Sequence, residues 1–125
     1  MRPLVLDTGA LIALERRDPR MVALSDEIIH ARCPAYTPAG VVAQAWRGSP
    51  RQHPMVRLMR SRHIQVDSLN EEVAYEIGVL LAASGTSDVI DAHVALLAGR
   101  VRGAVVTSDP GDITALDSGL EVLAL

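Results

Sequence analysis

The chain has 125 residues, of which 49% are hydrophobic and 22% charged, and its net charge is −3. This length suits one domain with a core that needs neither disulfides nor a structural metal, and this composition excludes a disordered protein. The single cysteine, Cys33, excludes an internal disulfide, and the absence of lysine excludes P-loop and Schiff-base chemistry. We therefore expect a single domain over residues 1–125, located in the cytoplasm, because the N-terminus has the pattern of neither a signal peptide nor a membrane span.

Short apolar segments alternate with longer segments of helical periodicity along the chain. Strands are predicted at residues 3–6, 35–37, 63–66, 103–108 and 120–123. Helices are predicted at residues 9–17, 21–31, 51–62, 70–83, 88–99 and 110–116, with one more that begins at Pro38, is capped by Thr37 and ends before Gly48. The alternation favours βαβ units, and hence an α/β fold with a mostly parallel sheet and helices on both faces.

Three aspartates, Asp7, Asp91 and Asp109, stand where a strand or loop meets a helix. If the strands are parallel, residues at their carboxyl ends converge on one crevice. Each acid also has a local explanation, because Asp is a preferred helix cap: Asp109 precedes Pro110 as an N-cap would, and Asp88 stands three residues before Asp91. Together, however, gathered carboxylates repel each other and need a cation, and an all-oxygen ligand set favours Mg²⁺ or Mn²⁺ over zinc.

Three segments resemble the acidic motifs of PIN-domain ribonucleases, and the likeness is closest to the VapC-type toxins of bacterial type II toxin–antitoxin pairs. The segments are LVLDTGALIAL at residues 4–14, SDVIDAHVA at 87–95 and AVVTSDP at 104–110. The resemblance implies a three-layer α/β/α PIN-like domain with a central, mostly parallel sheet of four to five strands. It also implies Mg²⁺- or Mn²⁺-dependent hydrolysis of RNA, with Asp7, Asp91 and Asp109 as catalytic metal ligands. Asp88, one helical turn before Asp91, can reach the same space and is a fourth candidate ligand.

Residues beside these aspartates are expected to assist them. The hydroxyls of Thr8, Thr107 and Ser108 are candidates to hold metal-bound waters or phosphate oxygens, although hydroxyls beside Asp are equally ordinary turn formers. VapC-type toxins usually carry a further acid in the helix after the second strand, and Gln44 occupies that place here. An amide oxygen is a weaker ligand for a hard cation, so metal affinity is expected to fall unless Asp88 compensates.

Positive charge is concentrated in one part of the sequence. Residues 28–66 contain no acid and six arginines, Arg32, Arg47, Arg51, Arg57, Arg60 and Arg62. Guanidinium groups pair well with phosphate, which favours an RNA backbone as the partner. Arg47 and Arg51 are the leading candidates to bind RNA, whereas solvated helix faces explain the three later arginines equally well. The resemblance adds two protein partners, a cognate antitoxin and a second copy of the chain in a homodimer, and no membrane.

Two alternative functions remain open. Asp7 begins an Asp-Thr-Gly triplet like that of aspartic proteases, some of which are small homodimers, but that class is all-β and the run after Gly9 has helical composition. Gln44 leaves open a PIN-like interaction module with weakened or lost catalysis. A phosphatase of the haloacid-dehalogenase type needs a second aspartate two residues after the first, where this chain has Gly9.

Overall fold

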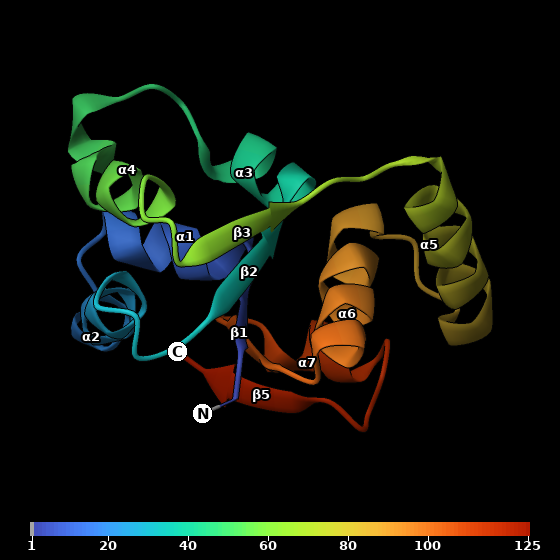
Figure 1. Ribbon diagram of the computed structural model, residues 1–125. Coiled ribbons are helices and arrows are strands. Elements are labelled where there is room, and N and C mark those ends of the chain that lie inside the picture. Colours follow the sequence, from blue (N-terminus) through green and yellow to red (C-terminus); the bar gives the residue numbers. More distant parts are fainter. Residues whose placement is uncertain (1) are drawn as a thin grey trace.

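The computed structural model describes residues 2–125, and a sheet of five strands lies at its centre (Figure 1). The strands are β1 (Leu4–Leu6), β2 (Ala35–Pro38), β3 (Ile64–Asp67), β4 (Ala104–Thr107) and β5 (Glu121–Ala124). Their order is β3-β2-β1-β4-β5, and every neighbouring pair is parallel. The predicted parallel α/β fold is therefore confirmed, and the all-β fold that an aspartic protease needs is ruled out.

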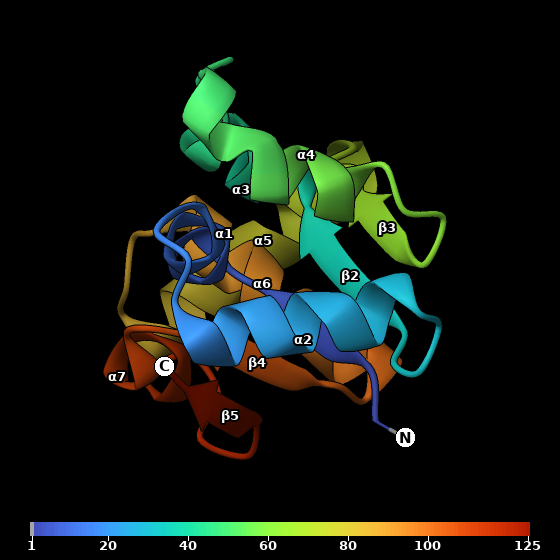
Figure 2. The same cartoon turned by 90° about the vertical axis from the view of Figure 1, so that its left-hand side faces the viewer.

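Helices cover both faces of the sheet. They are α1 (Thr8–Glu15), α2 (Pro19–Ile29), α3 (Ala39–Ala45), α4 (His53–Met59), α5 (Glu71–Ser84), α6 (Val89–Val101) and α7 (Pro110–Thr114), with a 3-10 turn, η1 (Pro50–Gln52), before α4. In Figure 2, α2 and α4 lie in front of the sheet, and Figure 1 shows α5 and α6 on the opposite side. Helix α6 packs on the sheet and α5 packs on α6, which gives the expected three layers.

The central strands β1 and β4 are apolar because both of their faces are covered. Val5, Leu6, Val105 and Val106 are all 0% exposed, as is usual for the middle of a parallel sheet between helices. Leu6 pairs in register with Val106, so the two strands end side by side. The residues that follow them, from Asp7 and from Ser108, therefore emerge next to each other at the carboxyl edge of the sheet.

The predicted cap of the helix after β2 is wrong. Thr37 is fully buried, and its Oγ1 donates to the backbone oxygen of Leu6 at 2.8 Å instead of capping a helix. Pro38 takes the N-cap position of α3 without a side-chain hydrogen bond. The hydroxyl of Thr37 joins two neighbouring strands, and the identity of those neighbours is set by the tertiary fold.

The predicted basic helix over residues 51–62 is also shorter than expected. Its beginning forms the 3-10 turn η1, and α4 covers only His53–Met59. Pro50 and Pro54 each stand in the first turn of one of these elements, where the missing N–H of proline costs nothing. The other predicted elements agree with the structure to within about two residues at each end.

No single helix within residues 2–125 is long and apolar enough to span a membrane, although α5 and α6, bent by 102° at their junction, reach that length and composition together.

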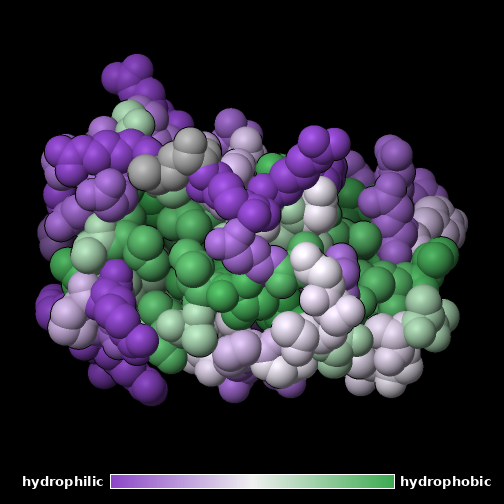
Figure 3. Space-filling model, turned by 90° about the horizontal axis from the view of Figure 1, so that it is seen from below, coloured by the Kyte–Doolittle hydropathy of each residue, from purple (hydrophilic) through white to green (hydrophobic). Residues whose placement is uncertain are grey.

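From below, on the side where β5 lies, hydrophobic surface runs between polar rims (Figure 3). Leu123 of β5 is 37% exposed, because β5 is an edge strand.

Candidate functional site

Asp7 lies between β1 and α1 and is almost completely buried, with 7% of its surface exposed. One carboxylate oxygen, Oδ1, accepts a hydrogen bond from the Ala10 backbone N–H at 2.9 Å, which makes Asp7 the N-cap of α1. Its own N–H donates to the backbone oxygen of Val106 at 3.3 Å, which ties the end of β1 to β4. Burial raises the pKa of Asp7, although hydrogen bonds from Thr107 and Ala10 oppose the rise.

Helix α6 brings two further acids to the same edge of the sheet. Asp88 is its N-cap and accepts from the Asp91 N–H at 2.9 Å. The pKa of Asp91 rises from 3.8 to about 6, first because the side chain is partly buried and then because Asp88, Asp112, Asp7 and Asp109 repel its negative charge. Four acids from three separate parts of the chain therefore lie close enough to act on Asp91, as the strand order requires.

Asp109 occupies the N-cap position of α7, but its side chain makes no capping hydrogen bond, so the alternative explanation as a helix cap does not account for its carboxylate. Its backbone N–H donates to the hydroxyl of Thr107 at 2.9 Å, and the Asp112 N–H is met by the backbone oxygen of Asp109 instead. The carboxylate of Asp109 is exposed and makes no hydrogen bond or ion pair among the described residues. The carboxylate of Asp109 is therefore more available to a ligand than those of Asp7 and Asp88, which each already accept a backbone hydrogen bond.

The first and third acidic segments touch directly. Gly9 sits in the first turn of α1, and a Cβ added there would lie 2.3 Å from Ser108 Oγ and 3.3 Å from Asp7 Oδ1. A glycine thus lets the Ser108 loop close against the start of α1. Thr8, beside Gly9, donates its hydroxyl proton to Gln44 Oε1 on α3. This contact places Gln44 next to the first acidic segment, with its amide oxygen already engaged.

The acids do not form a ready-made set of metal ligands. Within residues 2–125, no three His, Cys, Asp or Glu side chains come together closely enough to hold a metal ion. Asp88, Asp91 and Asp112 line one hollow of about 290 Å³, while Asp109 lines another of about 670 Å³. Their all-oxygen character and excess negative charge suit Mg²⁺ or Mn²⁺, but several side chains must move for one ion to be shared.

Three residues at this edge were not foreseen from the sequence. Asp112 lines the hollow with Asp88, and Arg16 and Arg20 line the hollow with Asp109. Arg16 is the C-cap of α1, about two turns beyond Thr8 and on the same side of the helix, so its placement was accessible from helical periodicity. Arg20 approaches from the beginning of α2, where its position depends on how α2 packs, and no sequence pattern carries that information.

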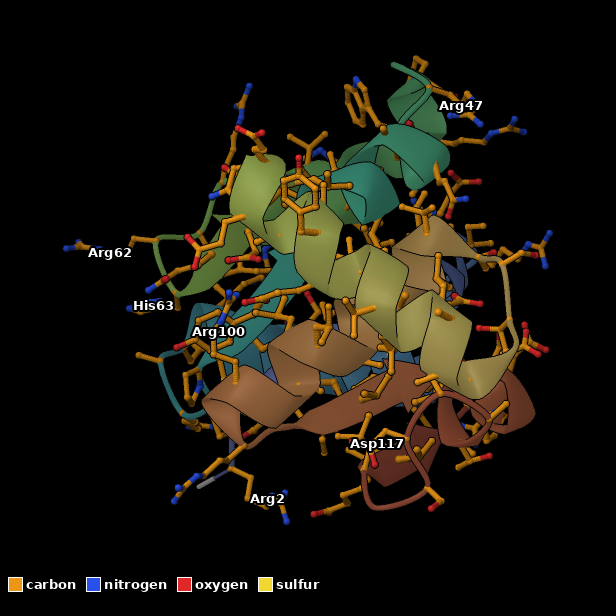
Figure 4. The ribbon with its side chains drawn as sticks, turned by 90° about the vertical axis from the view of Figure 1, so that its right-hand side faces the viewer. Arg2, Arg47, Arg62, His63, Arg100 and Asp117 are labelled. Atoms are coloured by element: carbon orange, nitrogen blue, oxygen red, sulfur yellow. The ribbon has the colours of Figure 1, made fainter. Side chains whose placement is uncertain are left out.

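The arginine-rich segment does not form one surface. Figure 4 shows Arg47 at one end of the molecule, beside α3, and Arg62 projecting from a different side. Arg57 is held by Asp26 at 3.1 Å, and Arg51 lies 4.0 Å from Glu15. Within the segment, only Arg47 and Arg51 lie directly after α3, the helix that carries Gln44.

A family model for the PIN domain matches residues 4–117. The chain is a PIN domain. Domains of this family are generally nucleases. The fold of the chain is confirmed as the three-layer α/β/α arrangement of that family.

Solved structures show the same fold. The PIN domain is 22% identical to a chain of FitAB bound to the IR36 DNA fragment, with 97% of this chain and 94% of that chain covered and a TM-score of 0.65. For PAE2754 from Pyrobaculum aerophilum the identity is 18%, the shares are 97% and 83%, and the TM-score is 0.63. For FitAcB from Neisseria gonorrhoeae the identity is 23%, both shares are 96%, and the TM-score is 0.59. No curated protein sequence matches the chain.

Proposed function

We propose that this PIN domain is a metal-dependent endoribonuclease and the toxin of a VapBC-type toxin–antitoxin pair. The observation that carries the proposal is the position of Asp91, whose carboxylate is partly buried and repelled by four other acids. Such a cluster is costly to keep charged without a cation. A divalent cation is also what metal-dependent hydrolysis of a phosphodiester uses to polarise the phosphate. The resemblance of the three acidic segments to VapC-type toxins supplies the toxin role.

Asp7 and Asp91 are the proposed principal ligands of Mg²⁺ or Mn²⁺, with Asp109 and Asp88 completing the set. Asp7 accepts hydrogen bonds from Ala10 and Thr107 and binds an ion through its remaining lone pairs, while Asp109 has both oxygens available. A bound divalent cation would supply a water of lowered pKa and would neutralise charge on the phosphate oxygens. The side chains must draw together to bind it, so we expect metal binding to order this edge of the sheet.

The remaining residues of the edge are proposed to hold the RNA. Arg16 and Arg20 line the hollow beside Asp109, where a phosphate between guanidinium groups and carboxylates would sit next to the cation. Arg47 and Arg51 extend this contact beyond Gln44. Thr107 is buried under Asp7 and orients that carboxylate and the Asp109 loop. Thr8 and Ser108 line the same hollow as Asp109 and face the substrate.

Two protein partners are part of the proposal. The cognate antitoxin follows from the resemblance, and the chain is proposed to act in the cytoplasm. A second copy of the chain is proposed to cover the outer face of α5, where Tyr75 is 71% and Val79 72% exposed and α5 carries no basic residue. Sedimentation of wild type and Val79→Glu tests this contact: a monomeric wild type, or an unchanged dimer in the variant, rules it out.

Cleavage of labelled RNA with and without Mn²⁺ tests the activity. We expect Asp7→Asn and Asp91→Asn to lose at least about 100-fold in rate, while the control Asp117→Asn, in the exposed loop before β5, keeps wild-type activity. Calorimetric titration with Mn²⁺ should show binding to wild type and Asp117→Asn only. Equal cleavage by all four proteins would assign the activity to a contaminant and reject the proposal.

A second candidate function is RNA binding without cleavage. It is favoured by the amide of Gln44 in place of an acid and by the lack of a preformed ligand set among the described residues. The same experiment separates the two functions. Absence of both Mn²⁺ binding and cleavage in the wild type, with RNA affinity retained, would establish the binding module.

A further inference from the structure

The connection between α3 and α4 exposes the chain's single tryptophan next to arginine. Trp46 is 44% exposed, and Arg47 and Arg51 are exposed as well. Single exposed hydrophobic side chains are common, so exposure alone assigns no role. The backbone on both sides of Trp46, however, is held in place by a buried side chain.

That side chain is Gln52, which is 1% exposed and has all of its hydrogen-bonding groups engaged. Its amide nitrogen donates to the backbone oxygen of Ala45 and to Glu15 Oε1, each at 2.7 Å, and its amide oxygen accepts from the Arg47 N–H at 2.9 Å. One buried amide thus fixes the residue before Trp46 and the residue after it. The indole is therefore displayed on a rigid support, which lowers the entropy cost of binding a ligand to it.

The charge beside the indole is fixed too. Arg47 Nη1 donates to the backbone oxygens of Ala43 at 3.1 Å and Trp46 at 2.7 Å, so its guanidinium lies over the carboxyl end of α3. The remaining nitrogens of this exposed group are free to bind an anion. An exposed indole and an exposed guanidinium on consecutive residues supply the two groups that bind the base and the phosphate of a nucleotide.

The location places this pair close to the acidic edge. Trp46 is the C-cap of α3, two residues after Gln44 on the same helix. Gln44 in turn accepts the hydroxyl proton of Thr8, the residue next to Asp7. Trp46 and the first acidic segment therefore both adjoin the short helix α3.

We propose that Trp46 stacks an unpaired base of the substrate while Arg47 holds a neighbouring phosphate. This inference rests on the proposed nuclease function and gives Trp46 a role in the preference for unpaired over paired RNA. A base inside a duplex is stacked on its neighbours and cannot meet the indole, so paired RNA is excluded from this contact. Stacking on an aromatic ring is tolerant of base identity, so Trp46 selects for single strands without selecting a sequence.

Fluorescence of Trp46 tests the stacking directly, because the chain has no other tryptophan. The full-length Asp91→Asn protein is titrated with a short unpaired RNA, with a chain of the same length made only of abasic ribose phosphates, and with an RNA duplex. We expect strong quenching by the unpaired RNA and little by the other two. Equal quenching by the abasic chain would show that charge alone is sensed, and would overturn the proposal.

Affinity in the same background gives an independent measurement. Trp46→Leu is expected to weaken binding of the unpaired RNA about 10-fold and to leave binding of the abasic chain unchanged. Arg47→Gln should weaken both, and Leu69→Ala, at a residue that is 42% exposed on the β3–α5 loop, should weaken neither. Unchanged RNA affinity in Trp46→Leu would reject the stacking role. Base-dependent quenching without Mn²⁺-dependent cleavage in the wild type would reject the nuclease and keep the RNA-binding surface.

Discussion

His93 Nε2 lies 2.8 Å from Asp67 Oδ2, and this contact ties the middle of α6 to the end of β3. Arg100, also on α6, reaches Asp67 Oδ1 at 2.7 Å. His93 is 1% exposed, so it is a packed residue, and its second ring nitrogen has no partner among the described residues. Partial burial works to raise the pKa of Asp67, but the hydrogen bonds from Arg100 and His93 outweigh it and lower that pKa. Asp67 thereby fixes the helix that carries Asp91.

Replacement of Asp67 should destabilise the protein. Asp67→Ala leaves the buried His93 without its acceptor, and we expect a loss of about 1 to 3 kcal/mol in urea unfolding near pH 7. Because the pKa is lowered in the folded state, this stabilisation is present above the unfolded pKa and disappears as the pH falls through the folded one. The control Asp26→Ala breaks only the exposed pair with Arg57 and should cost less than about 1 kcal/mol. Equal losses in the two variants would contradict the buried contact.

Removal of the Asp91 charge should stabilise the protein at alkaline pH. The folded-state pKa of about 6 lies above the ordinary value of 3.8, so above pH 6 the folded protein carries an unfavourable charge, and below 3.8 both states are neutral. Stability of the wild type therefore falls as the pH rises between these values. Discounted for solvent screening, Asp91→Asn should gain about 1 to 2 kcal/mol at pH 8 and nothing at pH 3.5.

Thermal unfolding at the two pH values, without added metal, measures this difference. Glu76→Gln, an exposed change on α5, serves as the control and should show no comparable gain at pH 8. An Asp91→Asn protein that is less stable than wild type at pH 8 would mean that burial and the neighbouring acids do not destabilise the charged form of Asp91.

Conversion of Gln44 to an acid should strengthen metal binding. Gln44→Glu keeps an oxygen that can accept from Thr8 and adds a negative charge beside Asp7. We expect roughly tenfold tighter Mn²⁺ binding by calorimetry, because ligand charge strongly tunes the affinity of hard cations, and a faster RNA cleavage. Ala43→Glu adds the same charge at the neighbouring exposed position of α3 and should change neither quantity. A similar gain in both variants would indicate a general charge effect.

Loss of the Gln52 amide should remove the hydrogen bonds that hold the α3–α4 connection and so lower the stability of the protein. Gln52→Leu keeps the volume but leaves the Arg47 N–H, the Ala45 oxygen and Glu15 without their partner, at an expected cost of about 2 to 3 kcal/mol in urea unfolding. Gln65→Leu changes an exposed residue of β3 and should stay within about 0.5 kcal/mol of wild type. A neutral Gln52→Leu would mean that water satisfies these groups equally well.

The order and type of the elements could be predicted from the sequence because the signals are local. The all-apolar segments of β1 and β4 indicate strands covered on both faces, and the positions of Asp7 and Asp88 indicate helix starts. Helix α2 begins at Pro19, two residues earlier than predicted, and this start too has a signal in the sequence. Asp18 caps that helix from before Pro19, with bonds of 2.9 and 3.2 Å to the next two N–H groups.

Only the tertiary structure decided which side chains share a space. Thr37 bonds to β1 instead of capping α3 because the fold places β2 beside β1. Asp112 and Arg20 join the acidic edge, and Gln52 meets Glu15, through contacts between elements distant in sequence. Periodicity records the face of a helix or strand that is buried, but it carries no information about the neighbour against which that face packs. The composition of the site depends on those neighbours.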